Sequence, residues 1–341
     1  MKKIFALLGV VAIVSLSACK KDDPQPEPAG GGTSNPPVVT ASTEGIYAPD
    51  AKVQTIKEDG ITVEEWSWEN GRLTTVTPYE DGAAATADAR LYAYDGHNRI
   101  TSIADGDMEM TFAYSGDRLQ SFTLKNEGET MMTSTVSARA NDKISKLDVA
   151  MSEGAISGML SEMLDNISDD AVSNVVSTVD LTWTGDNVTR TITSFGATVT
   201  MTLSQLAEML NLTSLVAQYP TIQTILNLYG SRPMDLVISV ADTANYTYDG
   251  KNNPFCGFLF GLEEFSLLSK ENVVSFTSNG TMTMELPAEL MTLLAAVPGL
   301  SQTMSYPVPS ESENYTYQYN VAGFPVSKNN GEKTVEYIYV Q

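Results

Sequence analysis

The fold is decided by a stretch at residues 92–103, which reads YAYDGHNRITSI. Two tyrosines stand two positions apart, an Asp-Gly pair follows them, and a second alternating run ends the stretch. Alternation with a period of two is typical of a half-buried β-strand, and Asp-Gly between two such runs is typical of a hairpin turn. Residues 92–103 therefore predict a β-hairpin.

The same pattern recurs along the chain. Residues 66–76 read WSWENGRLTTV, and residues 112–122 read FAYSGDRLQSF. More divergent copies begin at Leu181, Tyr246 and Tyr315. Consecutive hairpins favour an antiparallel meander, and a long twisted sheet tends to curl or to close in part.

Three segments between the later hairpins carry apolar residues at helical spacing. We expect helical insertions near residues 153–176, 203–229 and 287–297. Because an amphipathic helix must bury its apolar stripe, the sheet is the available partner. The predicted fold is β-rich (α+β): a long curved antiparallel meander, open or partly closed as a half-barrel, with amphipathic helices covering one face.

The N-terminus has the layout of a lipoprotein export signal. Lys2 and Lys3 precede an uncharged apolar run, and small residues stand just before Cys19. The run is too short to span a bilayer as a mature helix, so residues 1–18 are interpreted as a removable signal. Residues 16–19, LSAC, resemble the bacterial lipobox, in which the cysteine thiol receives diacylglycerol. We expect lipidated Cys19 to anchor the protein to a membrane.

The residues after the cysteine indicate where the lipoprotein is sent. Lys20, Lys21, Asp22 and Asp23 resemble the short signal that sends lipoproteins of the Bacteroidota to the outer face of the outer membrane. This resemblance predicts a lipid-anchored outer-membrane protein facing the cell exterior, with the periplasmic face as the alternative.

A tether separates the anchor from the folded part. Residues 19–43 are rich in proline, glycine, serine and acidic residues, a composition that cannot bury enough apolar surface to fold. Residues 44–341 are then predicted to form a single β-rich domain.

The hairpins also resemble a known group of proteins. Residues 92–100 are similar to the repeat Tyr-x-Tyr-Asp-x-x-Gly-Arg-Ile in cell-surface lipoproteins of the Bacteroidota that carry a domain of unknown function. Residues 248–255 with 269–274, and residues 315–339, resemble later signatures of that group. The repeats are also distantly similar to the YD repeats of large secreted proteins that form shells. The copies in this chain are too few to build such a shell. The helical insertions fit the pattern poorly. The resemblance implies the address and a β-architecture, and it carries no catalytic residues.

Charge excludes one class of partner. The chain has 20 Lys and Arg against 42 Asp and Glu, a formal charge of −22, which becomes −24 when Lys2 and Lys3 leave with the signal. Nucleic acid is not expected as a partner, because affinity for phosphate backbones comes from basic side chains.

No catalytic constellation is found in the sequence. The one histidine, His97, lies in a predicted turn, and with Cys19 lipidated Cys256 is the remaining cysteine. No Cys/His zinc site, catalytic triad or phosphate-binding loop can be assembled. Cys256 is interpreted as a small buried hydrophobe. We therefore predict a protein that is not an enzyme and has no metal or cofactor.

Two functions remain open. The first is an extracellular binding module for a glycan or peptide, with Trp66, Trp68 and Trp183 as candidate ligand contacts; against it, alternating aromatics are also what a sheet core needs. The second is a carrier of an apolar ligand or lipid between a curved sheet and the methionine-rich helices. Outward display favours the first, and a periplasmic position would favour the second.

Overall fold

The computed structural model describes residues 45–156, 171–210, 212, 219–257, 265–293 and 301–341. The signal, Cys19, residues 20–23 and the whole tether lie outside the described residues. The strands are β1 (Val53–Glu58), β2 (Ile61–Glu69), β3 (Arg72–Glu80), β4 (Ala83–Ala84), β5 (Arg90–Tyr94), β6 (Ile100–Asp105), β7 (Met108–Ser115), β8 (Arg118–Asn126), β9 (Glu129–Ala140), β10 (Lys143–Met151), β11 (Val172–Thr184), β12 (Asn187–Thr202), β13 (Pro233–Asn252), β14 (Glu271–Glu285), β15 (Thr303–Asn314), β16 (Thr316–Tyr319), β17 (Pro325–Asn329) and β18 (Thr334–Tyr339).

Strands that follow one another in the chain pair antiparallel in the sheet, with β3 pairing to β5 beside the short β4. The meander then returns to its start, because β18 pairs with β1, with Tyr337 opposite Ile56. The predicted β-rich meander is confirmed, and the sheet is nearly closed and barrel-like with one seam.

The seam lies between β15 and β16. β15 pairs with β14 as far as Asn314, and β16 pairs with β17 from Thr316 onward. Between them, the Tyr315 N–H donates to the Val274 carbonyl at 2.8 Å. One nearly continuous strand thus passes from one ladder to the other. The outer edge of β15 carries Pro307 and Pro309, which lack the N–H groups that a further strand would need.

Turn chemistry explains the hairpins. Between β2 and β3, Asn70 and Gly71 both have positive φ, 49° and 82°. This is the left-handed pair that a type I′ turn requires. The predicted turn is therefore confirmed there. The predicted copy at Tyr246 is wrong in one respect: β13 passes through Asp249-Gly250 to Asn252 with a register shift, and the chain then makes a long excursion before β14.

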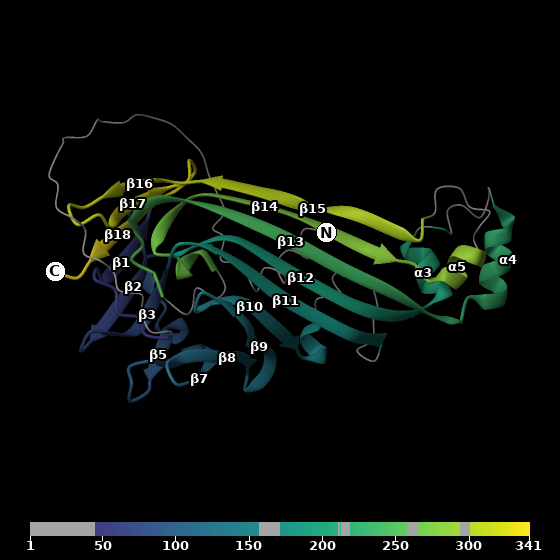
Figure 1. Ribbon diagram of the computed structural model, residues 1–341, viewed down its shortest axis with the longest axis horizontal. Coiled ribbons are helices and arrows are strands. Elements are labelled where there is room, and N and C mark those ends of the chain that lie inside the picture. Colours follow the sequence, from purple (N-terminus) through teal and green to yellow (C-terminus); the bar gives the residue numbers. More distant parts are fainter. Residues whose placement is uncertain (1–44, 157–170, 211, 213–218, 258–264, 294–300) are drawn as a thin grey trace.

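The described helices are α3 (Leu203–Met209), α4 (Pro220–Tyr229) and α5 (Ala288–Leu293), with 3-10 turns η1 (Thr86–Asp88) and η5 (Phe265–Leu268). A capping box of Thr202 and Gln205 begins α3, and a proline begins α4. In Figure 1 these three helices gather at one end of the long strands.

The first predicted helical insertion is wrong at its end. A helical turn follows Ser152, where the Ile156 N–H donates to the Ser152 carbonyl at 3.0 Å. Residues 157–170 lie outside the described part of the chain. From Val172, however, the chain is strand β11, and Val172 pairs with Val199 of β12. Valines 172, 175 and 176 are β-branched, which favours a strand.

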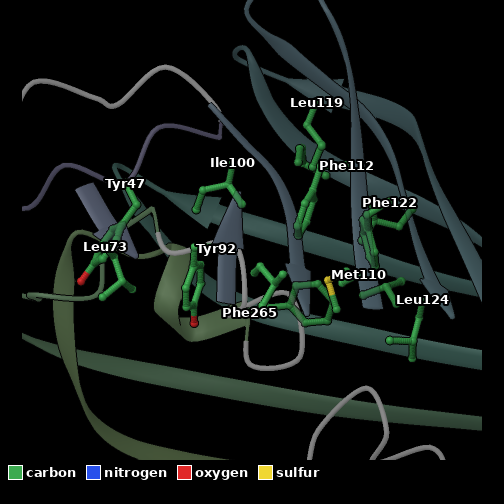
Figure 2. Close-up of a cluster of buried hydrophobic side chains, with 14 of the residues drawn as sticks. Tyr47, Leu73, Tyr92, Ile100, Met110, Phe112, Leu119, Phe122, Leu124 and Phe265 are labelled. Carbon is green, nitrogen blue, oxygen red and sulfur yellow. The ribbon is translucent and has the colours of Figure 1, made fainter. Parts of the chain in front are cut away.

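Two hydrophobic clusters make up the core. Cluster 1 fills the barrel-like end, where Figure 2 shows Phe265 of η5 among side chains of β5 to β8. Cluster 2 lies at the far end, between β12, β13 and β14 and the helices, with Leu206, Ile222 and Leu290 buried in it. The helices therefore cover one face of the sheet at its far end.

Candidate functional site

The turns that join β2 to β3, β5 to β6 and β7 to β8 lie at one end of the barrel, and an aromatic side chain ties each hairpin to the one before it. The Tyr94 hydroxyl donates to the Leu73 carbonyl, and the Tyr114 hydroxyl donates to the Ile100 carbonyl, both at 2.7 Å. The same contact recurs, each at 2.7 Å, in Trp68 Nε1 to Val53, Trp183 Nε1 to Ile144 and Tyr317 to Val273. We call these contacts the aromatic clasps.

A bulge accompanies most clasps. The pairing register shifts just before Trp68, Tyr94, Tyr114 and Trp183. A bulge re-aims the following side chain. The first aromatic of a pair therefore points into cluster 1, while the second reaches back to the neighbouring hairpin.

Cations cover the clasping rings. The Arg72 guanidinium lies 5.5 Å from the Tyr94 ring centre, and that of Arg99 lies 4.6 Å from the Tyr114 ring centre. Each cation immediately precedes the residue whose carbonyl accepts the clasp. Burial raises the pKa of Tyr94 to about 12, with Arg72 acting in the opposite direction. Tyr94 is therefore a neutral phenol at physiological pH.

The excursion after β13 enters the barrel. Phe255 packs between Trp66 and Tyr337, with ring centres 5.6 and 5.7 Å away. The buried Tyr47 hydroxyl donates to the Pro254 carbonyl at 2.9 Å. Burial raises the pKa of the neighbouring Cys256 thiol to about 11, which keeps it protonated and unreactive. Side chains thus fill the barrel interior here.

A cleft lies beside this filled part of the barrel interior. Its volume is about 420 Å³, and it lies between the segment at residues 46–48 and the turns that follow β2 and β5. Its polar lining includes Asn70, Arg72, Tyr94 and Asn98, with Glu69 at the rim. Arg72 donates a hydrogen bond to the Asn98 side-chain carbonyl, so the two turns are joined across the cleft. The cleft offers donors, acceptors, a cation and aromatic rings to a small polar ligand.

The three predicted tryptophans lie apart from this lining. Trp66 is 5% exposed in cluster 1. Trp68 and Trp183 are half-buried, and both use their indole N–H in clasps. These positions favour the core alternative, and a contact with ligand stays a prediction. His97 is exposed in its turn, where its backbone N–H donates to Asp95 Oδ1 at 2.8 Å.

Sequence reasoning missed Arg72 and Asn98. The available signal was a basic residue at the same position of consecutive repeats, Arg72, Arg99 and Arg118, just before the hydrophobe of the second strand. Among the described side chains, no three of the metal-ligating types stand close enough to hold a metal ion. Within the same part of the chain, no helix is long and apolar enough to cross a membrane.

Comparisons with known proteins add little. No protein-family model matches the chain, and no curated protein matches it. Among solved structures, a porin-like protein from Bacteroides uniformis aligns with 84% of this chain and 98% of its own, at 10% identity and a TM-score of 0.18. A likeness at that TM-score carries no argument about function.

Proposed function

We propose that the protein is a binding module held on the outer face of the outer membrane by lipid on Cys19, and that it binds an extracellular glycan in the cleft. The supporting observation is the cleft of about 420 Å³, where Asn70 and Asn98 place two side-chain amides beside Arg72 and Tyr94. Ligand sites commonly have volumes of this order and a few placed polar groups. Amides both donate and accept hydrogen bonds, which suits sugar hydroxyls.

Rigid support strengthens the proposal. The clasp from Tyr94 to Leu73 and the bond from Arg72 to Asn98 fix the two turns relative to each other. A site whose groups are already in place loses less entropy when it binds. The tether, residues 19–43, reaches up to roughly 80 Å when extended, so the cleft can turn outward from the membrane.

A peptide fits the cleft less well. Peptides are often bound as an added strand on a free sheet edge. The strands around the cleft, β2, β3, β5 and β6, each pair on both sides. The open edge of β15 carries two prolines. Peptide binding is therefore an outcome of the test and not our proposal.

The test is an oligosaccharide array probed with the full chain in mild detergent. We expect a defined set of glycans to bind, and Asn98→Ala to weaken that binding at least tenfold. Asn141→Ala is the matched control, because Asn141 has a similar positive φ, 50° against 66°, in the turn after β9, away from the cleft. Absence of glycan binding, or equal loss in both variants, would overturn the proposal.

The proposed location on the outer face of the outer membrane has its own test. We expect Cys19→Ser to release the protein from the membrane fraction. We expect protease added to intact cells to digest the wild-type chain. Protection in intact cells, with digestion only after the outer membrane is opened, would support the periplasmic alternative instead.

A second candidate function has one specific observation in its favour. Cluster 2 is rich in methionine, which adapts its shape to irregular apolar ligands. Its members are Met201, Met234 and Met284, with Met209, Met282, Met291 and Met304 packed against them. Native mass spectrometry of the Cys19→Ser full chain, purified without detergent, decides between the candidates. A bare chain agrees with the glycan proposal, and a lipid-mass adduct lost on denaturation would favour the carrier.

A further inference from the structure

Arg72 differs from the arginines around it in having no carboxylate partner in the part of the chain that the structure describes. Arg99 pairs with Asp95 at 2.6 Å, and Arg118 pairs with Asp142 at 2.7 Å. Arg90 pairs with Glu64. In a chain with 42 acidic residues against 20 basic ones, an arginine without such a partner needs an explanation.

The consecutive hairpins provide an internal comparison. Arg72 and Arg99 occupy the same position of the repeat, and each lies over the tyrosine of the next hairpin. In the second hairpin, Asp95 directly follows the aromatic pair. Its Oδ2 accepts from the Arg99 guanidinium, and its Oδ1 accepts from the Arg99 backbone N–H. In the first hairpin, Glu69 stands at the corresponding position but is exposed and makes no ion pair with Arg72. The carboxylate that Arg99 has within the chain is thus missing at Arg72.

Arg72 is also held ready to bind. Its guanidinium lies over Tyr94, one N–H group is used by Asn98, and the side chain is half-buried in the cleft wall. A guanidinium presents five donors in a rigid fork that matches the two oxygens of a carboxylate. The polar lining beside Arg72 also includes the amides of Asn70 and Asn98, the Thr74 hydroxyl and, at the rim, the Glu69 carboxylate.

We propose that the ligand of the cleft is an acidic sugar, with its carboxylate on Arg72 and its hydroxyls on the amides of Asn70 and Asn98. This inference rests on the proposed function and names its ligand class. The ligand carboxylate takes the place that Asp95 fills for Arg99. A bidentate, charge-assisted pair in a partly enclosed cleft is stronger than a neutral hydrogen bond.

Replacing Glu69 tests the proposal, because the direction of the change in affinity depends on the charge of the ligand. A carboxylate at the cleft rim repels an acidic ligand and competes for Arg72, so Glu69→Gln should tighten binding two- to fivefold. For a neutral or cationic ligand, the same variant should weaken binding or leave it unchanged.

The experiment uses the full chain and a panel of oligosaccharides that carry hexuronic or nonulosonic acids, each beside its methyl ester and a neutral analogue. We expect binding to be confined to the free acids, to fall at least tenfold on esterification, and to weaken as salt is raised. Arg72→Gln should abolish this preference. Arg118→Gln, the equivalent position two hairpins on, should leave binding within twofold, and thermal unfolding checks that both variants fold.

The outcomes separate the two proposals. If neutral sugars and esters bind as well as acids and Arg72→Gln has no effect, the acidic-sugar inference is overturned while the glycan proposal stands. Preference for sulfated over carboxylated sugars also overturns it. If no member of the panel binds, the acidic-sugar inference is overturned; if the oligosaccharide array shows no glycan binding either, both proposals are overturned.

Discussion

The two ends of the molecule are stabilised in different ways. At the barrel end, the sheet nearly closes on itself, and aromatic clasps tie several hairpins to their neighbours over cluster 1. At the far end, β12, β13 and β14 extend for 16, 20 and 15 residues, and helices cover one face over cluster 2. Figure 1 shows these long strands leaving the closed end for the helices.

The difference explains where a precise site can form. Clasps and closure hold turn residues such as Asn70 and Asn98 in fixed relative positions. Cluster 2 instead mixes leucine and isoleucine with more methionine than cluster 1, and methionine side chains pack adaptably and specify position weakly. A polar ligand that needs several directed hydrogen bonds is therefore matched to the barrel end, and an apolar ligand would be matched to the far end.

The largest expected effect comes from truncating one leucine in each cluster. Leu73 and Leu236 are both fully buried, and each change to alanine should lower the free energy of unfolding by about 3 kcal/mol. Leu73→Ala should lower the protection of backbone amides against hydrogen exchange across the whole sheet, because closure couples the strands. Leu236→Ala should lower that protection mainly in α3, α4 and the far ends of the long strands. Hydrogen exchange read by mass spectrometry checks this, and identical exchange maps would contradict the division into two regions.

A glycine comparison tests the barrel end alone. Gly45 and Gly60 both have positive φ, 85° and 82°, so alanine strains both backbones. A Cβ at Gly45 would overlap the Tyr114 ring, whereas one at Gly60 meets nothing within 4 Å. Gly45→Ala should therefore cost about 2 kcal/mol more than Gly60→Ala. Thermal unfolding measures the difference, and equal losses would show that the segment at residues 45–48 adds nothing to the clasped end.

Much of the fold could be predicted from sequence because its signals are local. The turn at Asn70-Gly71 needs two left-handed residues, and the stripes that predicted α3 and α4 repeat every three to four positions. Closure by β1 and β18 could not be predicted, since it joins residues at opposite ends of the chain. At Asp249-Gly250 the turn signal produced a bulge in β13, because pairing with β14 outweighed local preference.

The candidate site was harder to predict than the fold. Trp66, Trp68 and Trp183 are candidate ligand contacts by sequence, with the sheet core as the alternative. Trp66 is buried, and the indole N–H groups of Trp68 and Trp183 are used in clasps. Arg72 and Arg99 look alike in sequence, and the carboxylates Glu69 and Asp95 follow the same aromatic position. Only the geometry shows that Asp95 reaches its arginine while Glu69 does not. Side-chain pairing across a turn depends on turn shape, which residue types alone do not determine.

A tyrosine comparison isolates a single clasp. Tyr114→Phe removes the donor to the Ile100 carbonyl and should cost about 1 kcal/mol. Tyr306→Phe at the far end is the control, because the residue is exposed and, among the described residues, its hydroxyl bonds to the Met304 sulfur, 3.6 Å away. It should change stability by less than about 0.5 kcal/mol. Chemical denaturation measures both, and equal effects would show that the clasps contribute no stability.

The smallest expected effect concerns pH, and two carboxyls, Asp95 and Asp242, should respond with opposite signs. Hydrogen bonds from the Arg99 backbone N–H and its guanidinium lower the pKa of Asp95 to about 2, so its contribution is present above pH 4 and is lost as pH falls further. Burial, and then the nearby Glu311, raise the pKa of Asp242 on β13. Its buried Oδ1 has no hydrogen-bond partner among the described residues.

A raised carboxyl pKa means that the folded state binds the proton more tightly than the unfolded state. Lowering the pH from 7 toward 4 should therefore stabilise the middle of β13 through Asp242, while Asp95 keeps its contribution until it protonates below pH 4. Asp242→Asn should remove this acid stabilisation and raise stability at pH 7 by a few tenths of a kcal/mol, roughly the effect of relieving a partly buried charge. Hydrogen exchange of β13 and of the turn after β5, measured at pH 7 and pH 5 with intrinsic rates corrected, would show this. Parallel changes at β13 and at the turn after β5 would mean that the two sites respond to acid as one unit.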